Sequence, residues 1–206
     1  MDSAERKRLV ERGYDRMAER YLASKGALGA ETAELLDALT RGLDGEAAIL
    51  DLGCGAGVPV TRWLAGRFRV TGVDLSARQL ALAREAVPGA TFIRGDMAEM
   101  DFAPGSFAAI VSLYAIIHLP REEHPALLAR IARWLAPGGG FLATWPVTAW
   151  EGEERDWHGW GAAMWWSHHG SEENLALLRA AGFVIERAET RTSGEEIWLW
   201  VLARRG

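Results

Sequence analysis

The sequence predicts a single α/β domain of 206 residues, built on a mostly parallel β-sheet. Residues 47–145 alternate between short apolar runs and amphipathic stretches, which is the pattern of consecutive strand–helix–strand units. Residues 183–190 and 197–204 are two further strand-like runs, and a short polar turn at Ser193 and Gly194 joins them. Strands joined so closely are typical of antiparallel neighbours, so we expect a parallel sheet that ends in a hairpin.

Short runs of apolar and β-branched residues predict the strands of the parallel part. They lie at 47–52, 68–73, 91–93, 107–113 and 141–145. The run at 107–113 is apolar on both faces, as expected for a strand in the centre of the sheet.

Helical spacing of apolar residues predicts the helices that follow these strands. They lie at 58–65, 76–86, 121–135 and 171–181. Pro59 is tolerated in the first turn of a helix, and Ser76 or Asp74 is available as the N-cap of the second helix. Ser171 and Asn174 resemble a capping box at the start of the last helix.

Two segments flank this core. Residues 1–45 are charged and have helical spacing, so they predict a helical N-terminal segment. Residues 146–170 lack a clean period but are rich in tryptophan, in a chain that has 10 tryptophans altogether. The tryptophans of this insert are Trp150, Trp157, Trp160, Trp165 and Trp166.

The composition excludes several classes of protein. Hydrophobic residues make up 49% of the chain, which is enough for a sizeable core, and the formal net charge is −5. An acidic chain is a poor non-specific ligand for nucleic acid or anionic lipid, so we expect neither partner. Cys54 is the single cysteine, which excludes an intramolecular disulfide and a Cys-based zinc site, and we expect no metal. Without an apolar leader, the cytoplasm is the expected location.

A glycine-rich loop is the strongest local motif. It follows the first predicted strand and reads Asp-Leu-Gly-Cys-Gly-Ala-Gly at 51–57. Glycine permits a sharp turn and a close approach of a ligand to the backbone, and the next helix offers free N–H groups at its start. A dinucleotide fingerprint would need a third glycine where Val58 or Val60 stands, and no Gly-Lys-Ser/Thr sequence exists. A ligand without a pyrophosphate is therefore favoured.

Acidic residues follow the next two predicted strands. Asp74 ends the second strand at about the 20-residue offset at which an acid accepts hydrogen bonds from ribose hydroxyls. Asp96 and Met97 follow the third strand, where a carboxylate can accept from an adenine amino group while the methionine packs on the ring. These positions predict a site for an adenosyl group.

Together these motifs resemble the class I S-adenosylmethionine-dependent methyltransferases of the small-molecule branch. The matching segments are 51–57, 73–76, 95–97, 107–119 with its closing His-Leu-Pro, 135–139, and the N-terminal Tyr-Asp-Arg-Met-Ala-Glu-Arg-Tyr at 14–21. The resemblance covers most of the chain. It implies a Rossmann-like, doubly wound sheet of seven strands in the order 3-2-1-4-5-7-6, with strand 7 antiparallel and helices on both faces.

The resemblance also implies the site residues and the cofactor S-adenosyl-L-methionine, whose product is S-adenosyl-L-homocysteine. The expected cofactor contacts are Asp51, Gly53, Cys54, Gly55, Gly57, Asp74, Leu75, Gln79, Asp96, Met97, Ser112 and Leu113. In this family the N-terminal segment, here 1–45, acts as a lid, and the insert at 146–170 covers the acceptor pocket. The expected acceptor contacts are Tyr14, Tyr21, Tyr114, Trp145 and Trp165.

The expected reaction is the in-line displacement of a methyl group from a sulfonium to a small-molecule acceptor. A structural role in the loop after the fourth strand is favoured for His118. If a general base is needed, His118 or one of the insert histidines, His158, His168 and His169, is the candidate. An acidic cluster at 151–156 predicts either a solvated loop or attraction of a cationic acceptor. The alternatives for the whole chain are a methyltransferase that acts on protein or RNA, a nucleotide-dependent oxidoreductase, and a cofactor-binding protein without catalysis.

Overall fold

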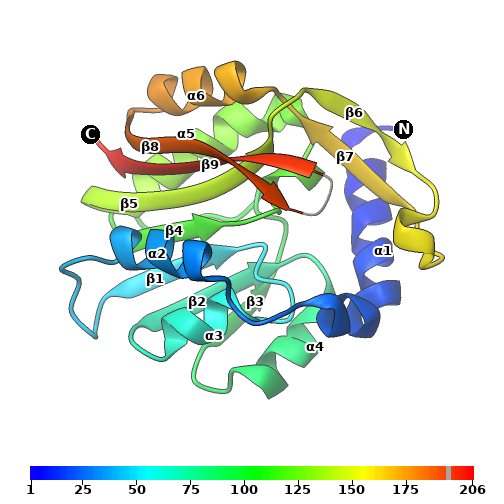
Figure 1. Cartoon of the computed structure of the whole chain (residues 1–206), viewed down its shortest axis with the longest axis horizontal. Coiled ribbons are helices and arrows are strands. Elements are labelled where there is room, and N and C mark those ends of the chain that lie inside the picture. Colours follow the sequence, from blue (N-terminus) through cyan, green and yellow to red (C-terminus); the bar gives the residue numbers. More distant parts are fainter. Residues whose placement is uncertain (194–195) are drawn as a thin grey trace.

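The computed structural model describes residues 1–193 and 196–206, and its centre is a seven-stranded sheet of order β3-β2-β1-β4-β5-β9-β8 (Figure 1). The strands are β1 (Ala48–Leu52), β2 (Arg69–Asp74), β3 (Thr91–Arg94), β4 (Phe107–Ser112), β5 (Leu135–Pro146), β8 (Phe183–Ser193) and β9 (Glu196–Arg205). β1 to β5 are parallel, whereas β9 runs antiparallel to both β5 and β8. The predicted order and the antiparallel seventh strand are confirmed. Gly194, which belongs to the predicted turn, lies outside the described residues.

Helices pack on both faces of the sheet. They are α2 (Ala30–Leu39), α3 (Val60–Ala65), α4 (Ala77–Ala86), α5 (His124–Trp134) and α6 (Ser171–Ala180). In Figure 1, α2 and α3 lie in front of the sheet and α5 lies behind it. The core between the layers contains Trp134, Phe141 and Trp145, each no more than 1% exposed.

Three element boundaries differ from those predicted. The third predicted helix is a 3₁₀ turn, η2 (Arg121–Glu123), followed by α5, because Pro125 fits only near the start of an α-helix. β5 begins six residues early, since Leu135 already pairs with Phe107 before a register shift. Ser171 forms no capping box: Gly170 is the N-cap of α6, and the Ser171 hydroxyl donates to the Val147 carbonyl at 3.3 Å.

The Trp-rich insert is more regular than its sequence predicts. Its strands β6 (Trp150–Glu154) and β7 (Met164–His168) pair as an antiparallel hairpin outside the main sheet. A 3₁₀ turn, η3 (Trp157–Gly159), lies between them. The hairpin packs against the N-terminal helix, and this tertiary contact supplies the order that the local sequence does not predict.

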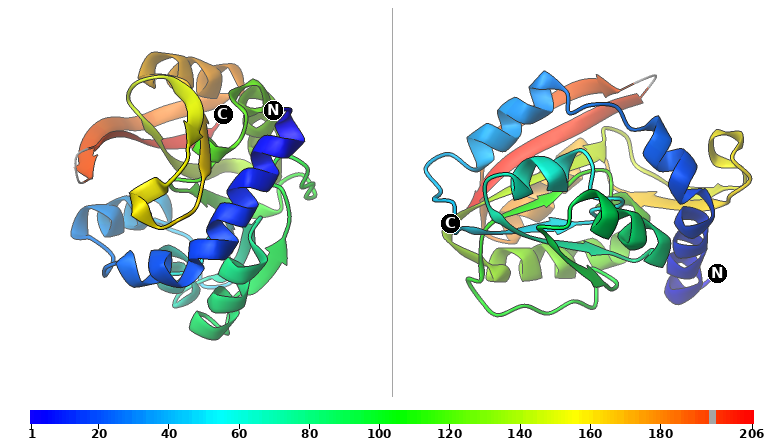
Figure 2. Two further views of the ribbon diagram at one scale, coloured as in Figure 1. Left: turned by 90° about the vertical axis from the view of Figure 1, so that its right-hand side faces the viewer. Right: turned by 90° about the horizontal axis from the view of Figure 1, so that it is seen from below.

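The N-terminal helix α1 (Ser3–Ser24) lies beside the β6–β7 hairpin across one end of the sheet, as both views of Figure 2 show. Asp2 and Glu5 form a capping box at its start. Gly13 brings α1 close to β7, since a Cβ at that position would lie only 2.7 Å from the Ala163 carbonyl oxygen. Along the two described stretches of chain, none of the helices has the length and hydropathy needed to cross a membrane.

Candidate active site

The glycine loop after β1 has a backbone that requires glycine. Gly53 and Gly55 have φ angles of +77° and +54°, in the left-handed region. A Cβ at Gly53 would overlap the Cβ of Ala115, whereas a Cβ at Gly55 would meet only the Gln79 side chain, at 3.8 Å. Gly57 has a different role, because its Cα faces Ala83 and Val87 and permits close packing of the neighbouring helix. Gly53 and Gly55 line both cavities described below, whereas Gly57 lines neither.

Asp74 lies at the carboxyl end of β2, directly beside this loop. Its Oδ2 accepts the backbone N–H of Gly55 at 2.8 Å, and its Oδ1 accepts the N–H of Ser76 at 2.9 Å. Burial raises the pKa of Asp74, although these two hydrogen bonds act in the opposite direction. Each carboxylate oxygen can accept more than one hydrogen bond, so Asp74 keeps acceptor capacity for a ligand.

Asp51 is the last residue but one of β1 and is only 3% exposed. Its Oδ2 accepts a hydrogen bond from the Thr61 hydroxyl at 2.6 Å. Burial raises the pKa of Asp51 to about 7, even though the bond from Thr61 favours the ionised form. A cation beside Asp51 would therefore stabilise its charged form.

Asp96 connects the site to the N-terminal helix. Its Oδ1 accepts the N–H of Ala98 at 2.8 Å, and its Oδ2 lies 2.7 Å from the Lys7 Nζ. Lys7 also contacts Glu123 at 2.6 Å. Burial lowers the pKa of Lys7, but the hydrogen bonds to Asp96 and Glu123 outweigh that effect and raise it overall. The predicted adenine contact is thus covered by α1.

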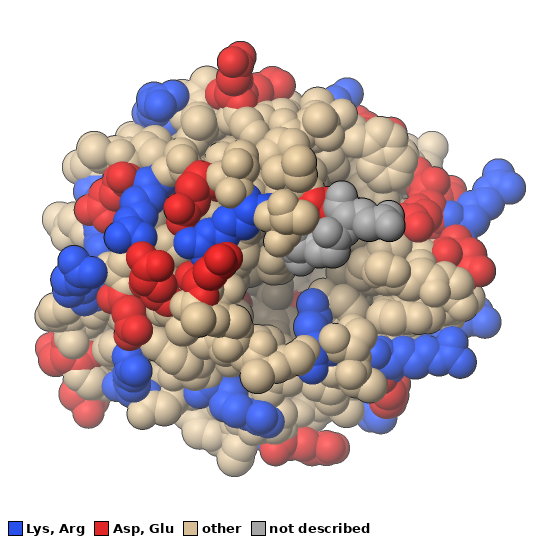
Figure 3. Space-filling view, viewed as in Figure 1, with Lys and Arg blue, Asp and Glu red and all other residues tan. Residues whose placement is uncertain are grey.

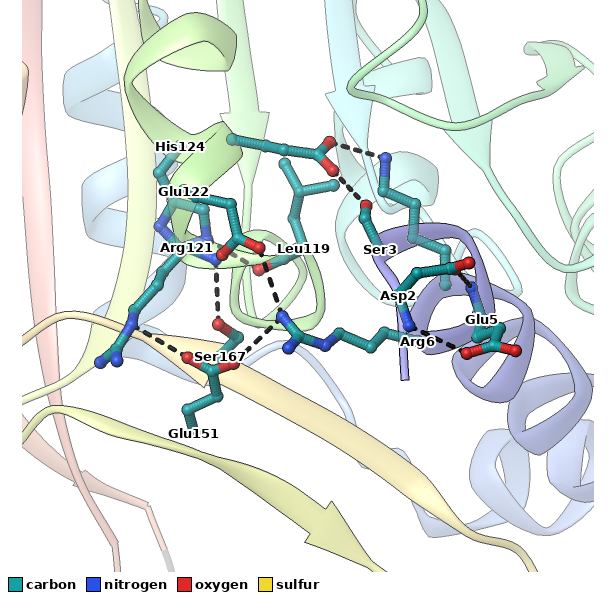
Figure 4. Close-up of polar contacts among 12 residues, drawn as sticks. Asp2, Ser3, Glu5, Arg6, Leu119, Arg121, Glu122, His124, Glu151 and Ser167 are labelled. Atoms are coloured by element: carbon teal, nitrogen blue, oxygen red, sulfur yellow. Dashed lines mark hydrogen bonds and ion pairs between the residues drawn. The ribbon is translucent and has the colours of Figure 1, made fainter.

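A network of charged groups fixes the start of α1 over the site (Figure 4). Arg6 bridges Glu122 at 3.3 Å and Glu151 at 3.1 Å, and Glu151 also pairs with Arg121 at 3.0 Å. These contacts join α1 to η2 and to β6. Glu151 therefore serves an ion-pair network, and the acidic cluster at 151–156 contributes no residue to the lining of the two cavities described below.

A narrow cavity of about 90 Å³ lies between α1 and the carboxyl ends of β1 to β4. Eight of the predicted cofactor residues line it: Gly53, Gly55, Asp74, Leu75, Gln79, Asp96, Met97 and Leu113. Lys7, Tyr14 and His118 contribute from α1 and from η1 (Ile116–His118).

A second, wider cavity of about 840 Å³ adjoins the first, and it opens at the hollow in the centre of Figure 3. Asp51 and Cys54 line it beside the glycine loop, and Lys25 lines it at the end of α1. Small, aliphatic and polar residues of the segments 22–32 and 56–60 form part of its other walls. Eight aromatic residues also line it: Tyr14, Tyr21, Tyr114, Trp157, Trp160, Trp166, Trp198 and Trp200. The two cavities share the residues Tyr14, Tyr21, Gly53, Gly55, Leu113 and Tyr114.

Tyr14 and His118 form a hydrogen-bonded pair near the junction of the cavities. The Nδ1 of His118 lies 2.9 Å from the Trp165 carbonyl, which can only accept, so Nδ1 carries the proton. The Nε2 atom is then the acceptor for the Tyr14 hydroxyl, at 2.8 Å. Burial lowers the pKa of His118 to about 4, and burial raises the pKa of Tyr14 well above its usual value. Both groups are therefore neutral at neutral pH.

Some predicted site residues lie elsewhere. Ser112 is buried and its hydroxyl donates to the Leu52 carbonyl at 3.0 Å, joining β4 to β1. Trp145 lies in the core of the sheet. Trp165 packs beneath the Arg6 guanidinium, 4.7 Å from the ring centroid, and lines neither cavity.

Other cavity residues were absent from the prediction. Trp198 and Trp200 come from β9, and Trp166 is the neighbour of the predicted Trp165. The spacing of Trp198 and Trp200 is a usable signal, because residues i and i+2 of a strand share one face. Nothing in the sequence marks Lys7 as a site residue, since it is one of many charged residues on an amphipathic helix.

Comparison with known proteins agrees with this geometry. Residues 49–139 match a family described as a methyltransferase domain. Trans-aconitate 2-methyltransferase of Paracidovorax citrulli is 43% identical over 95 residues, which cover 44% of this chain and 35% of that protein. Phosphoethanolamine N-methyltransferase 3 of Arabidopsis thaliana is 30% identical over 185 residues, which cover 87% of this chain and 36% of that protein. The chain thus spans little more than a third of the length of these two curated relatives.

Solved structures share the fold across nearly the whole chain. An S-adenosylmethionine-dependent methyltransferase from Mesorhizobium loti has a TM-score of 0.70 and 26% identity, covering 86% of this chain and 98% of its own. The [4+2]-cyclase SpnF has a TM-score of 0.73 at 19% identity, covering 95% and 94%, and shows the fold alone. With the matched domain, the sheet order and the glycine loop flanked by acids, the chain belongs to the class I S-adenosylmethionine-dependent methyltransferases.

Proposed function

We propose that this protein transfers a methyl group from S-adenosylmethionine to a small-molecule acceptor. The observation that carries the proposal is the pair of adjoining cavities. One is narrow and has carboxylates and bare backbone, and the other is wide and aromatic. Their shared residues lie where a reacting methyl group would pass from one ligand to the other.

The residues of the narrow cavity fit the cofactor. Asp74 has spare acceptor capacity for ribose hydroxyls, and Gly55 leaves room for a ligand against the backbone. Asp96 and Met97 would hold the adenine, and Asp51, which lines the adjoining wide cavity, would hold the amino group of the methionyl arm. When bound, S-adenosylmethionine supplies an electrophilic methyl group on its sulfonium.

The protein's own contribution to the reaction would be mainly alignment and exclusion of water. α1 and the β6–β7 hairpin cover the site, and aromatic rings surround the space for the acceptor. If the acceptor must lose a proton, Tyr14 would take it while passing its own proton to the Nε2 of His118, a transfer that the lowered pKa of His118 opposes. His118 would then act through Tyr14, because the Tyr14 hydroxyl already occupies its free nitrogen.

The walls of the wide cavity favour an acceptor with a flat or apolar part, since tryptophan and tyrosine faces bury such surfaces well. The relatives named as acting on trans-aconitate and on phosphoethanolamine are consistent with a small acceptor. The acidic composition favours neither nucleic acid nor anionic lipid as a partner, and we expect the protein to work in the cytoplasm.

Isothermal titration calorimetry with S-adenosylhomocysteine tests the cofactor site. We expect the wild type to bind, and Asp74→Ala to weaken binding at least about 100-fold, since charge-assisted hydrogen bonds are worth roughly 1.5–3 kcal/mol each. Asp37→Ala is the matched control, because Asp37 is an exposed partner of Arg67 outside both cavities. Equal affinities for wild type and Asp74→Ala would contradict the site. The methyl transfer is then tested by incubating the protein and S-adenosylmethionine with a panel of small acids, amines and phenols, and by measuring the S-adenosylhomocysteine that forms.

A further inference from the structure

Lysine is rare in this chain, and both lysines lie at the candidate site. Of the 23 lysine and arginine residues, only Lys7 and Lys25 are lysines. Lys7 lines the narrow cavity, and its ammonium is already paired with Asp96 and Glu123. Lys25 lines the wide cavity, and no carboxylate among the described residues pairs with its ammonium. The charge of Lys25 is therefore available to a ligand.

Two tyrosine rings hold the Lys25 ammonium near the junction of the cavities. Lys25 is the C-cap of α1, where its backbone N–H donates to the Leu22 carbonyl at 3.0 Å. The residue is exposed, yet its Nζ lies 4.0 Å from the centroid of the Tyr21 ring and 5.9 Å from that of the Tyr114 ring. Both rings line the narrow cavity as well as the wide one. A cation–π contact orients an ammonium without neutralising it, so the positive charge stays beside residues that the two cavities share.

The acidic residues of the wide cavity do not neutralise this charge. In the described part of the chain these residues are Asp51, which is buried beside the glycine loop, and Glu196, which is exposed and begins β9. Neither of them pairs with Lys25. A cationic acceptor group at the rings of Tyr21 and Tyr114 would be repelled by the ammonium that already lies there, whereas an anionic group would pair with it.

The neighbouring walls determine what else the acceptor contains. The ring of Trp198 lies 4.6 Å from that of Tyr114, and the ring of Trp200 lies 5.9 Å from it, measured between centroids. Both tryptophans come from one face of β9 and line the wide cavity. An ammonium is a compact point charge, so it can pair with a carboxylate or with a phosphate. These surroundings fit a molecule that has an anionic group next to a flat, apolar part.

We propose that Lys25 is a specificity-determining residue that selects an anionic methyl acceptor. Its ammonium pairs with a carboxylate or phosphate group of the acceptor, while the rings of Tyr114 and Trp198 cover the flat part. The same charge disfavours acceptors that carry an ammonium group at that position. This inference rests on the proposed function, since it assumes that the acceptor occupies the wide cavity.

The test is calorimetry of the full chain saturated with S-adenosylhomocysteine. The probes are the anions trans-cinnamate and phenyl phosphate, the neutral cinnamamide and the cationic phenethylamine. We expect at least one anion to bind about fivefold more tightly than cinnamamide, which is the size of effect of a partly exposed ion pair, and phenethylamine to bind more weakly than cinnamamide. In Lys25→Met, which removes the charge, the advantage of that anion should shrink to about twofold or less, while the affinity for cinnamamide stays unchanged. The two anions distinguish a carboxylate acceptor from a phosphate acceptor.

Three further variants keep the test decisive. Lys25→Glu should reverse the order, so that phenethylamine binds more tightly than either anion, and Lys25→Arg should keep most of the preference for anions. Because Lys25 is exposed, all its variants should melt at the wild-type temperature. Arg12→Met is the matched control, since it removes a positive charge from an exposed position of the same helix outside both cavities, and it should leave all four affinities unchanged.

Three results would overturn the inference. They are anions that bind the wild type no more tightly than cinnamamide, a wild type that binds phenethylamine most tightly, and a preference for anions that survives in Lys25→Met. A wild type that does not bind S-adenosylhomocysteine would instead overturn the proposed function.

Discussion

Replacing His118 by glutamine should change how the stability of this protein depends on pH. His118 is buried and neutral, with Nδ1 donating to the Trp165 carbonyl and Nε2 accepting from Tyr14. Protonation would place a second N–H against the Tyr14 hydroxyl, which would have to rotate to accept it. Burial is the main reason that the pKa of His118 falls to about 4 in the folded protein.

The size and the sign of the effect follow from this pKa. The unfolded chain binds a proton at this histidine near pH 6.5, whereas the folded protein does so only near pH 4. The stabilising effect of the neutral folded site is therefore complete above pH 6.5 and is progressively lost as the pH falls toward 4. Between pH 7.5 and pH 5 the loss is about 2 kcal/mol in the free energy of unfolding.

Chemical denaturation at pH 7.5 and pH 5 measures this loss in the wild type and in His118→Gln. The comparison between the two proteins is needed because Asp51 and Asp74 have raised pKa values, so their contributions make the folded protein more stable, not less, as the pH falls. These contributions are the same in both proteins and cancel in the difference. We expect the pH-dependent change in unfolding free energy to differ by about 2 kcal/mol between them. His124→Gln should give a similar value, since burial also lowers the pKa of His124 to about 4. A difference below about 0.5 kcal/mol for His118→Gln would refute the reasoning.

Three further substitutions test individual contacts of the site. Gly53→Ala would place a side chain on a left-handed backbone and against Ala115. The free energy of unfolding should therefore fall by about 2–4 kcal/mol, and the melting temperature measured by calorimetry should fall by roughly 5–15 °C. An unchanged melting temperature would show that the loop tolerates a Cβ. Thr61→Val removes the hydroxyl group that favours the ionised form of Asp51, so the pKa of Asp51 should rise further above its usual value. Affinity for S-adenosylhomocysteine should then fall several-fold at pH 7 and recover at pH 8.5. A loss of affinity that does not depend on pH would exclude this cause. Ser112→Ala should lower the free energy of unfolding in urea by about 1 kcal/mol and should change the affinity for S-adenosylhomocysteine by no more than about twofold. A large loss of affinity would place Ser112 in the cofactor site.

Local patterns were sufficient to predict the strands of the main sheet, whereas the order of the strands came from the family resemblance. Each parallel strand is a short apolar run, and the glycines and acids that follow β1, β2 and β3 stand at the edge where ligands bind in such sheets. The β6–β7 hairpin could not be predicted in this way. It is ordered by contacts of Ala162 and Met164 with Val10 and Met17, which are about 150 residues distant in the sequence.

The aromatic residues of the acceptor cavity show a second limit. Trp165 and Trp166 are adjacent on β7, so their side chains point to opposite faces, and only Trp166 lines the cavity. Composition indicates an aromatic wall, but the register of the strand decides which ring belongs to it. Composition likewise cannot tell whether Trp145 lines the cavity or packs in the core. Its strand β5 is buried on both faces over residues 141–145, so Trp145 packs in the core.

The position of α1 has a kinetic consequence. α1 lies over the narrow cavity and is tied down by Lys7 and Arg6, whereas the wide cavity reaches the surface beyond the end of this helix. On the proposed function, a nucleoside in the narrow cavity would lie beneath α1, and an acceptor in the adjoining wide cavity would then stand between the nucleoside and the opening of that cavity. Turnover should follow a compulsory order in which S-adenosylmethionine arrives first and S-adenosylhomocysteine departs last, and inhibition by added S-adenosylhomocysteine should be competitive only toward the methyl donor.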